Sequence, residues 1–368
     1  MRIDAVELVR CQLPFVSPFR TSFGVQHGRD VVLVRVIGAD TEGWGENVAG
    51  EEPLYSAEFV DASVLALRHH LVPRLLAAHD VTPFDVARLL APVRGWEMAK
   101  AALEAAVLDA ELRRQNVSLV DWLGGSRRHV PVGVSVGLHD RVDDTVAAVV
   151  GYLDQGYVRI KLKIEPGRDV DLVRAVREAI GPDVMLQVDA NAAYTLADAR
   201  HLARLDSFDL LLIEQPLAEH DLRQHAQLAR MLHTPLCLDE SITSAQVAAD
   251  AVALGSCSIV NIKPGRVGGL LEARRIHDLC VANGVPVWCG GMLETGVGRA
   301  ANLALAALPG FTLPPDLSAS SRYFRQDLTQ PFELVDGGLE VPTGPGIGVV
   351  PESSVLADLG AVTERLGT

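Results

Sequence analysis

The sequence is poor in cysteine, and its cysteines follow no recognisable pattern. Five of the 368 residues are cysteine, an odd number, and no two of them have the CxxC spacing. This scatter argues against a disulfide framework or a cysteine-based metal site and is typical of structural thiols in a reduced intracellular protein. The five are Cys11, Cys237, Cys257, Cys280 and Cys289.

The sequence also lacks a basic run and a long apolar run. The formal net charge is −14, which makes nucleic acid or an anionic membrane a poor partner. Apolar runs such as 210–213 are too short to cross a bilayer, and residues 1–15 contain no signal-peptide core. We therefore expect a cytoplasmic protein whose partner is a small molecule or another copy of itself.

The central part of the chain alternates short β-rich runs with amphipathic helical stretches. Such alternation gives parallel strands with crossover helices, and seven repeats in succession favour a closed barrel over an open sheet. The predicted strands are 131–137, 157–164, 184–191, 210–215, 235–240, 258–263 and 285–289.

The regions on either side of these repeats have different patterns. A β-rich run at 31–37 comes first, Gly43, Gly45 and Gly50 are predicted to lie in loops or turns, and a helical pattern follows from about residue 56. Gly124-Gly125 suggests a domain boundary. After residue 321, Asp336-Gly337 between two apolar runs predicts a hairpin, in a tail that we expect to return to the first domain.

Charged residues recur at the predicted strand ends. Alternation along 158–164 puts Arg159, Lys161 and Lys163 on the face opposite the apolar residues, and therefore inside the barrel. Four further charged residues then follow Lys163 at intervals of 24 to 26 residues, one in each repeat. Because active sites form at the carboxyl ends of barrel strands, the spacing predicts one ring of charged groups. The four are Asp189, Glu214, Asp239 and Lys263.

This set of residue types has a chemical meaning. Three converging carboxylates repel one another unless a cation lies between them, and all-oxygen ligands suit Mg²⁺, with Mn²⁺ or another divalent cation as a substitute. A lysine on each side of the three acids is placed for acid/base work, since nearby positive charge lowers the pKa of a lysine. Any one of these residues alone is more simply a helix cap or a salt-bridge partner; the joint spacing favours catalysis.

Five short motifs resemble the enolase superfamily, in the branch with a lysine on each side of the metal. They are Lys161-Leu162-Lys163, Val188-Asp189-Ala190-Asn191, Ile213-Glu214-Gln215-Pro216, Leu238-Asp239-Glu240-Ser241 and Asn261-Ile262-Lys263-Pro264-Gly265. The resemblance covers essentially the whole chain. It implies an α/β fold in which a (β/α)7β TIM-like barrel over 126–320 carries an α+β capping domain, formed by 1–125 and completed by the tail 321–368.

Four more segments resemble one family of that branch, the o-succinylbenzoate synthases and N-acylamino acid racemases. They are Pro18 to Gly24, Gly133 to Gly137, Trp288 to Gly296 and Ser318 to Ser320. The family implies two reactions on one site: dehydration of a cyclohexadiene carboxylate in menaquinone synthesis, and racemisation of N-succinyl or other N-acyl amino acids. Both begin by removing a proton next to a metal-bound carboxylate.

The resemblance also implies a role for individual residues. Asp189, Glu214 and Asp239 would hold Mg²⁺, and Lys163 and Lys263 would be the acid/base pair. Asn261 and Glu240 would support them. Residues expected to bind the substrate are Ser135, Lys161, Asn191, Gly291 and Leu293 from the barrel, with Phe19, Phe23 and Tyr55 from the first domain as a lid. For Phe19, plain packing between the domains is an equal alternative. Gly290 and Gly291 are expected to leave room for an elongated ligand.

Three rival functions stay open at this point. Dipeptide epimerases of the same branch carry two aspartates one residue apart near the last barrel strand, and here the second is missing from Asp316-Leu317-Ser318. Muconate cycloisomerase is the second rival, and a non-catalytic barrel that kept its charged residues is the third. The family also implies a homo-oligomer, often an octamer.

Overall fold

The repeated strand–helix pattern forms a parallel sheet of seven strands in the computed structural model, which describes residues 1–22 and 24–367. Neighbours in the sheet are also neighbours in the chain, so every crossover adds the next strand to the same growing edge. All seven strands lie inside the predicted ranges. They are β5 (Gly133–Val136), β6 (Arg159–Lys163), β7 (Met185–Asp189), β8 (Ile213–Glu214), β9 (Leu236–Leu238), β10 (Ile259–Ile262) and β11 (Val287–Cys289).

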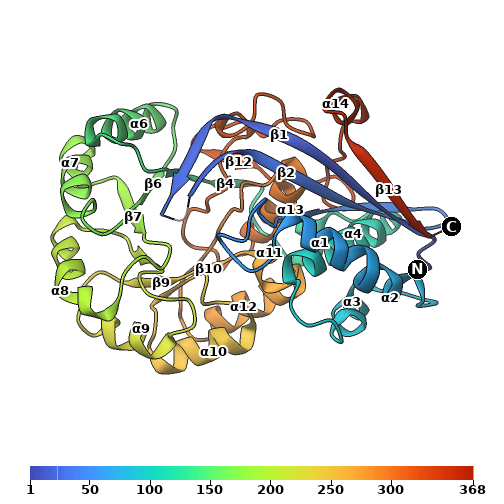
Figure 1. The fold of residues 1–368 in the computed structure, drawn as a ribbon, viewed down its shortest axis with the longest axis horizontal. Coiled ribbons are helices and arrows are strands. Elements are labelled where there is room, and N and C mark those ends of the chain that lie inside the picture. The colour runs from blue at the N-terminus through green and yellow to red at the C-terminus, as the bar shows by residue number, and fades with distance from the viewer. Residues whose placement is uncertain (23, 368) are drawn as a thin grey trace.

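Helices cover the outside of this sheet (Figure 1). Helix α7 shows why: Val170, Val173 and Val176 recur at helical spacing on its buried face, and Asp169 caps its first turn. None of the helices within the described parts of the chain has the length and apolar character needed to cross a membrane. The outer helices are α6 (Val142–Asp154), α7 (Val170–Ile180), α8 (Ala199–Leu202), α9 (Leu222–Ala229), α10 (Ala245–Leu254), α12 (Leu270–Ala282) and α13 (Gly296–Ala306).

An irregular segment closes the barrel between β11 and β5. Phe311 bridges to β11, and the Asp316 amide donates to the carbonyl of Cys289 over 3.1 Å. On the other side, the Gly133 amide of β5 donates to the carbonyl of Pro315 over 2.9 Å. Pro314 and Pro315 have no N–H to donate, so the segment cannot be a regular strand. Seven strands and this irregular eighth segment therefore form the barrel.

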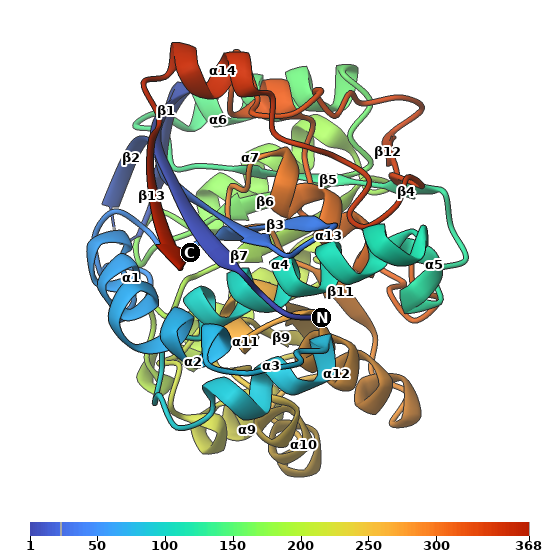
Figure 2. The same ribbon diagram turned by 90° about the vertical axis from the view of Figure 1, so that its right-hand side faces the viewer.

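A four-stranded antiparallel sheet forms the capping part, with the order β13-β1-β2-β3. Its last strand, β13 (Val362–Gly367), pairs along β1, so the tail returns to the first part of the chain and the two ends lie close together (Figures 1 and 2). The exact domain bounds stay a prediction. The other strands are β1 (Ala5–Thr21), β2 (Gly24–Ile37) and β3 (Glu42–Asn47), and the helices are α1 (Val60–Ala66), α2 (Val72–Leu76), α3 (Pro83–Leu90), α4 (Glu97–Gln115) and α5 (Leu119–Leu123).

The predicted hairpin in the tail is only half right. Asp336 and Gly337 both have positive φ and form a two-residue turn, across which Val335 and Gly338 exchange backbone hydrogen bonds. The strand after the turn, β12 (Gly338–Glu340), pairs instead with β4 (His129–Pro131). The run before it forms no strand, because both backbone groups of Phe332 bond to Ser320.

The prediction that Gly43 and Gly45 lie in a loop is wrong, since both lie in β3. The strand packs directly against α4, and a Cβ on Gly45 would stand 2.1 Å from the carbonyl oxygen of Ala102. At Gly43 a Cβ would stand 2.2 Å from the carbonyl oxygen of Ala106. The glycines therefore permit close strand–helix contact rather than a turn.

We expect Gly45→Ala to lower the free energy of unfolding by about 1–3 kcal/mol, because the added methyl group overpacks this contact. Gly151→Ala is the matched control. Gly151 lies inside α6, and a Cβ added there would have no neighbouring atom within 4 Å among the described residues. Alanine should therefore be neutral or slightly stabilising at this position. Thermal unfolding of the two variants measures the difference, and an unchanged Tm for Gly45→Ala would contradict the packing argument.

Candidate active site

The five charged residues predicted from their spacing meet at the carboxyl end of the barrel. Lys163, Asp189 and Glu214 are the last residues of β6, β7 and β8. Asp239 and Lys263 directly follow β9 and β10. All five side chains are buried, the most exposed being Lys163 at 8%. The β/α repeat thus converts distant positions in the chain into one cluster.

Each carboxylate of the cluster is paired with an amine. Lys163 Nζ lies 2.6 Å from Asp189, and Lys263 Nζ lies 2.7 Å from Asp239. Lys161 Nζ, the next cation on β6, lies 2.9 Å from Glu214. Among the described residues, no three His, Cys, Asp or Glu side chains are already arranged as a metal cage. The amines therefore neutralise the acids in this arrangement.

The pKa values reflect this pairing. Burial alone would raise the pKa of Asp189, but Lys163 and Lys161 lower it well below its usual range. Burial alone would lower the pKa of Lys263, but Tyr55, Glu240 and further carboxylates outweigh burial and raise it. The carboxylates beside Lys263 thus favour its ammonium form.

The donor set fits a divalent cation. Burial and repulsion from Asp189 raise the pKa of Glu214, which shows that the acids crowd one another. Asn261 Nδ2 donates to Glu214 over 2.7 Å and orients it. Asn261 Oδ1 and Glu240 Oε2 are buried acceptors without a hydrogen-bond partner among the described residues. Crowded oxygen ligands and spare oxygen acceptors suit Mg²⁺ or Mn²⁺.

The cluster contains a fourth acid that the spacing did not predict as a site residue. Asp316 lies on the irregular eighth segment. Its carboxylate oxygens lie 2.7 Å from an Arg159 guanidinium nitrogen and 2.5 Å from Lys161 Nζ. Burial would raise its pKa, but these two cations lower it to about 2. Both cations also lie over the ring of Trp288. Asp316 follows two prolines in a segment without strand periodicity, so strand spacing could not indicate it. Its match to the first aspartate of the epimerase pattern is the signal that could have found it.

Two more residues, which were assigned no role from the sequence, hold the rim in place. The Arg266 guanidinium pairs with Asp239 and donates to the carbonyls of Ile242 and Asn261. Gln215 has positive φ, and its side-chain oxygen accepts from the amides of Asp239 and Ser241 over 3.0 and 3.1 Å. It fixes the end of β9 from the neighbouring strand. Gln215 lies within one of the five motifs and Arg266 directly follows another, which is the signal that could have found them.

A pocket opens above the cluster, with a volume of about 740 Å³ including the part open to solvent. Seven of the eight predicted substrate-binding residues line it, and the eighth, Phe23, lies outside the described residues. The seven are Phe19, Tyr55, Ser135, Lys161, Asn191, Gly291 and Leu293. The pocket is also lined by Thr21, Gln26, Arg29, Met292, Asp316 and Tyr323, which the sequence did not indicate as pocket residues.

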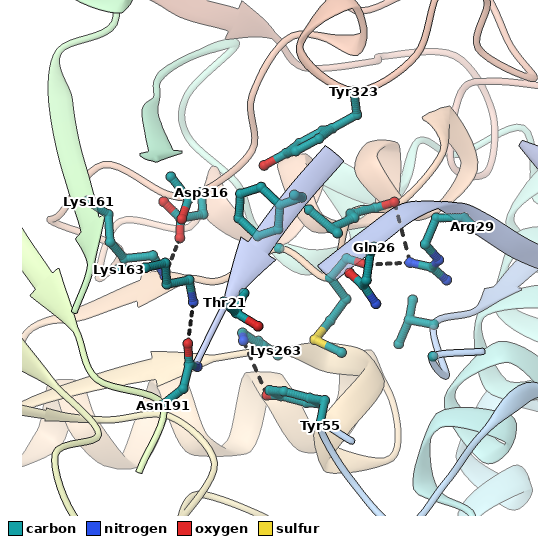
Figure 3. A pocket seen from close by; sticks show the side chains of 17 residues that line it. Thr21, Gln26, Arg29, Tyr55, Lys161, Lys163, Asn191, Lys263, Asp316 and Tyr323 are labelled. Atoms are coloured by element: carbon teal, nitrogen blue, oxygen red, sulfur yellow. Dashed lines mark hydrogen bonds and ion pairs between the residues drawn. The ribbon is translucent and has the colours of Figure 1, made fainter. Parts of the chain in front are cut away.

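The two predicted catalytic lysines enter this pocket from different sides (Figure 3). Strands β7, β8 and β9 separate the strand of Lys163 from the strand that Lys263 follows. Lys163 Nζ donates to Asn191 Oδ1 over 2.7 Å, and Lys263 Nζ donates to the Tyr55 hydroxyl over 3.2 Å. Asn191 in turn donates to Glu240 over 2.9 Å. A ligand between the lysines would therefore meet an amine on each face.

The glycines after β11 make room for neighbouring parts of the protein, and Gly291 also lines the pocket. That they leave room for an elongated ligand stays a prediction. A Cβ on Gly290 would lie 2.3 Å from Asn261 Oδ1 and 2.6 Å from Lys263 Cε. A Cβ on Gly291 would lie 2.5 Å from the carbonyl oxygen of Asp316. The capping part also shapes this loop, since Arg29 donates to the carbonyl of Met292. Phe19 both lines the pocket and packs edge-on against Tyr323.

Comparison with known proteins assigns this arrangement to a family. The description "Mandelate racemase / muconate lactonizing enzyme, N-terminal domain" matches residues 5–124, and "Enolase C-terminal domain-like" matches residues 144–355. The chain belongs to the enolase superfamily. The prediction from the sequence of an enzyme of this superfamily is confirmed.

Relatives that match nearly the whole chain include proteins named for each of two reactions. An N-succinylamino acid racemase of Amycolatopsis sp is 59% identical over the full length of both chains. An o-succinylbenzoate synthase of Geobacillus kaustophilus is 50% identical over 95% of this chain and 93% of its own. A crystal structure of an enolase superfamily member from Listeria innocua has a TM-score of 0.95 and 40% identity, covering 100% of this chain and 99% of that one.

Proposed function

We propose that the protein removes the proton next to the carboxylate of an N-succinyl or other N-acyl amino acid and returns a proton to the opposite face, as a racemase. The observation that supports this most directly is the pair of lysines, Lys163 and Lys263, on two sides of one pocket above three buried acids. The full-length relative named as a racemase agrees with it. A second activity, o-succinylbenzoate synthesis in menaquinone synthesis, is favoured by the relatives of that name.

In this proposal Asp189, Glu214 and Asp239 hold Mg²⁺, for which Mn²⁺ can substitute. When bound, the cation supplies positive charge beside the substrate carboxylate and stabilises the negative charge that develops as the proton leaves. Carboxylates engaged in this way would no longer favour the ammonium form of Lys263, and the positive charge beside it would lower its pKa. A lysine base works in its neutral form.

The remaining pocket residues position the substrate. Lys161 lies beside Asp189 and Glu214, where the substrate carboxylate would approach. Ser135, Gly291 and Leu293 surround the acyl arm, and the buried Ser135 hydroxyl has no partner among the described residues, which leaves it free to bind that arm. Phe19 and Tyr55 from the capping part exclude water from the reacting atoms. In the dehydration reaction Lys163 removes the proton and Lys263 stabilises the anion.

The structure gives a reason against a dipeptide epimerase. That activity needs acidic groups free to hold the amino end of a dipeptide, whereas Asp316 is already engaged with Arg159 and Lys161. The neighbouring Ser318 hydroxyl lies 3.4 Å from the carbonyl of Gly133. An enzyme that acts on an N-acyl amino acid does not need such an acid, because the nitrogen of that substrate is an uncharged amide and not an ammonium group.

Removal of metal should abolish turnover. We expect the protein, after treatment with EDTA and desalting, to lose at least about a thousandfold of its racemase rate on N-succinyl-phenylalanine, because several kcal/mol of charge stabilisation disappear. Polarimetry follows the rate, and added Mg²⁺ or Mn²⁺ should restore it. The Tm, measured in parallel, controls for unfolding. Turnover that persists without metal would contradict the assignment of the three acids, and turnover of the cyclohexadiene substrate alone would leave the synthase as the function.

A further inference from the structure

A second cavity lies behind the wall of the substrate pocket. We call it the rear cavity; its volume is about 1430 Å³ including the part open to solvent. The capping part supplies residues from 55–58 and 94–98, and the barrel supplies loops after β8, β9 and β10. Its lining includes Tyr55, Glu97, Glu219, Glu240, Thr243 and Arg266.

Tyr55 separates the rear cavity from the substrate pocket. It is the one described residue that lines both. Lys263 Nζ donates to its hydroxyl and lies 5.0 Å from the centre of its ring. Arg266, on the rear side of this wall, pairs with Asp239. Arg266 thus connects the lining of the rear cavity to Asp239 of the acid cluster.

The two cavities are lined by charges of opposite sign. The substrate pocket is lined by four cations, Arg29, Lys161, Lys163 and Lys263, and by one acid, Asp316. The three lysines are paired with buried acids that do not line this pocket, so the pocket meets the amines and not these partners. Such a lining attracts a carboxylate substrate and repels a divalent cation. The rear cavity presents Glu97, Glu219 and Glu240 in addition to Glu58, against Arg94 and the already paired Arg266. Its lining favours a cation.

Glu240 connects the rear cavity to the acids. Its side chain is buried, with 8% exposure, and it lines the rear cavity but not the substrate pocket. One carboxylate oxygen accepts from Asn191, whereas the other has no hydrogen-bond partner among the described residues. A buried carboxylate oxygen without a donor is costly unless a cation or water satisfies it. Asn191 donates to Glu240 from its side chain and to Asp189 from its backbone amide, so a cation that reached Glu240 would be close to the proposed metal site.

We propose that the rear cavity is the route by which the divalent cation reaches and leaves Asp189, Glu214 and Asp239, while the carboxylate substrate uses the other mouth. The inference rests on the proposed function, because it needs a metal at these three acids. Two mouths of opposite charge let metal and substrate exchange independently. The rear cavity acts on the rate of metal exchange and not on the affinity of the site.

A tryptophan placed in each mouth tests the route. Thr243 is exposed and lines only the rear cavity, whereas Gln26 lines the substrate pocket and not the rear cavity. The full-length protein is loaded with Mn²⁺ and mixed with excess EDTA, and the release of Mn²⁺ is followed by EPR; uptake by the stripped protein is followed in the same way. The equilibrium Kd for Mn²⁺ is measured separately.

We expect Thr243→Trp to slow uptake and release together, by about tenfold or more, with an unchanged Kd. The matched Gln26→Trp should raise KM for the substrate and leave both metal rates as they are. Equal metal rates in Thr243→Trp and the parent, or slowing in Gln26→Trp alone, would overturn the route. If the parent bound no Mn²⁺ at equilibrium, the proposed metal site itself would be wrong, which is a different outcome.

A variant with fewer acidic residues tests the proposed metal route independently. Glu97→Gln combined with Glu219→Gln removes two acids from the rear cavity and touches none of the proposed ligands. We expect slower Mn²⁺ uptake, by about three- to tenfold at low salt, and a weaker dependence of the rate on ionic strength. An uptake rate with the same value and the same salt dependence as the parent would contradict the role of these charges.

Discussion

Lys163→Ala should abolish removal of the α-proton from one enantiomer of N-succinyl-phenylalanine while leaving exchange from the other enantiomer measurable. The reason is that each lysine faces the pocket from its own side, so each serves one face of the substrate. Loss of a positioned base costs about 10²–10⁴-fold in rate. Proton–deuterium exchange in D₂O, measured by NMR on each pure enantiomer, separates the two half-reactions.

Lys263→Ala is the matched control and should show the opposite preference. Racemisation, which needs both lysines, should be lost in both variants. If Lys163→Ala still racemised in both directions, the two-base assignment would be wrong. If both variants lost exchange from the same enantiomer, the two amines would act on one face, which contradicts their separation across the barrel.

Asp316→Asn should destabilise the protein strongly. Its carboxylate is paired with two buried cations, Arg159 and Lys161, and breaking a buried ion pair from one side costs about 3–5 kcal/mol because a charge is left uncompensated. The expected fall in Tm is roughly 2–4 °C for each kcal/mol. Asp140→Asn is the matched control. Asp140 pairs with Arg20 at 2.8 Å but its side chain is 89% exposed, and such pairs contribute about 0–1 kcal/mol.

The same carboxylate should contribute to acid sensitivity. Its pKa is lowered to about 2 in the folded protein, below the usual value of about 3.9 for an unfolded aspartate. A group with a lowered folded pKa stabilises the protein above its unfolded pKa and loses that contribution as the pH falls toward the folded value. The parent should therefore lose more stability than Asp316→Asn between about pH 5 and pH 2. Equal Tm values for Asp316→Asn and Asp140→Asn at pH 7 would show that the buried pair is not important.

The ring of strand-end residues could be predicted from the sequence because the β/α repeat is local. Each repeat has nearly the same length, and the side-chain alternation of a strand is a property of neighbouring residues. Lys163, Asp189, Glu214, Asp239 and Lys263 therefore come together as soon as the sheet forms. Residues outside this regular repeat could not be predicted in this way. Examples are Asp316, in the segment with two prolines, and the glycines of β3.

Contacts between the capping part and the barrel could not be predicted in the same way. Arg29 bonds to Met292 and Tyr55 to Lys263 across more than two hundred residues of chain. No periodicity links such positions, because they meet only through the packing of one folded part on another. The rear cavity is a property of the same interface and has no motif of its own.

The amino-acid sequence by itself determined the parallel repeat, the place of five charged side chains on its strand ends and the family. The tertiary structure alone decided which charges pair, where the pocket opens and which side of Tyr55 each charge faces. The reason is physical. Side-chain alternation along a strand depends on consecutive residues, whereas a buried charge is neutralised by groups that the rest of the chain brings within a few ångströms of it.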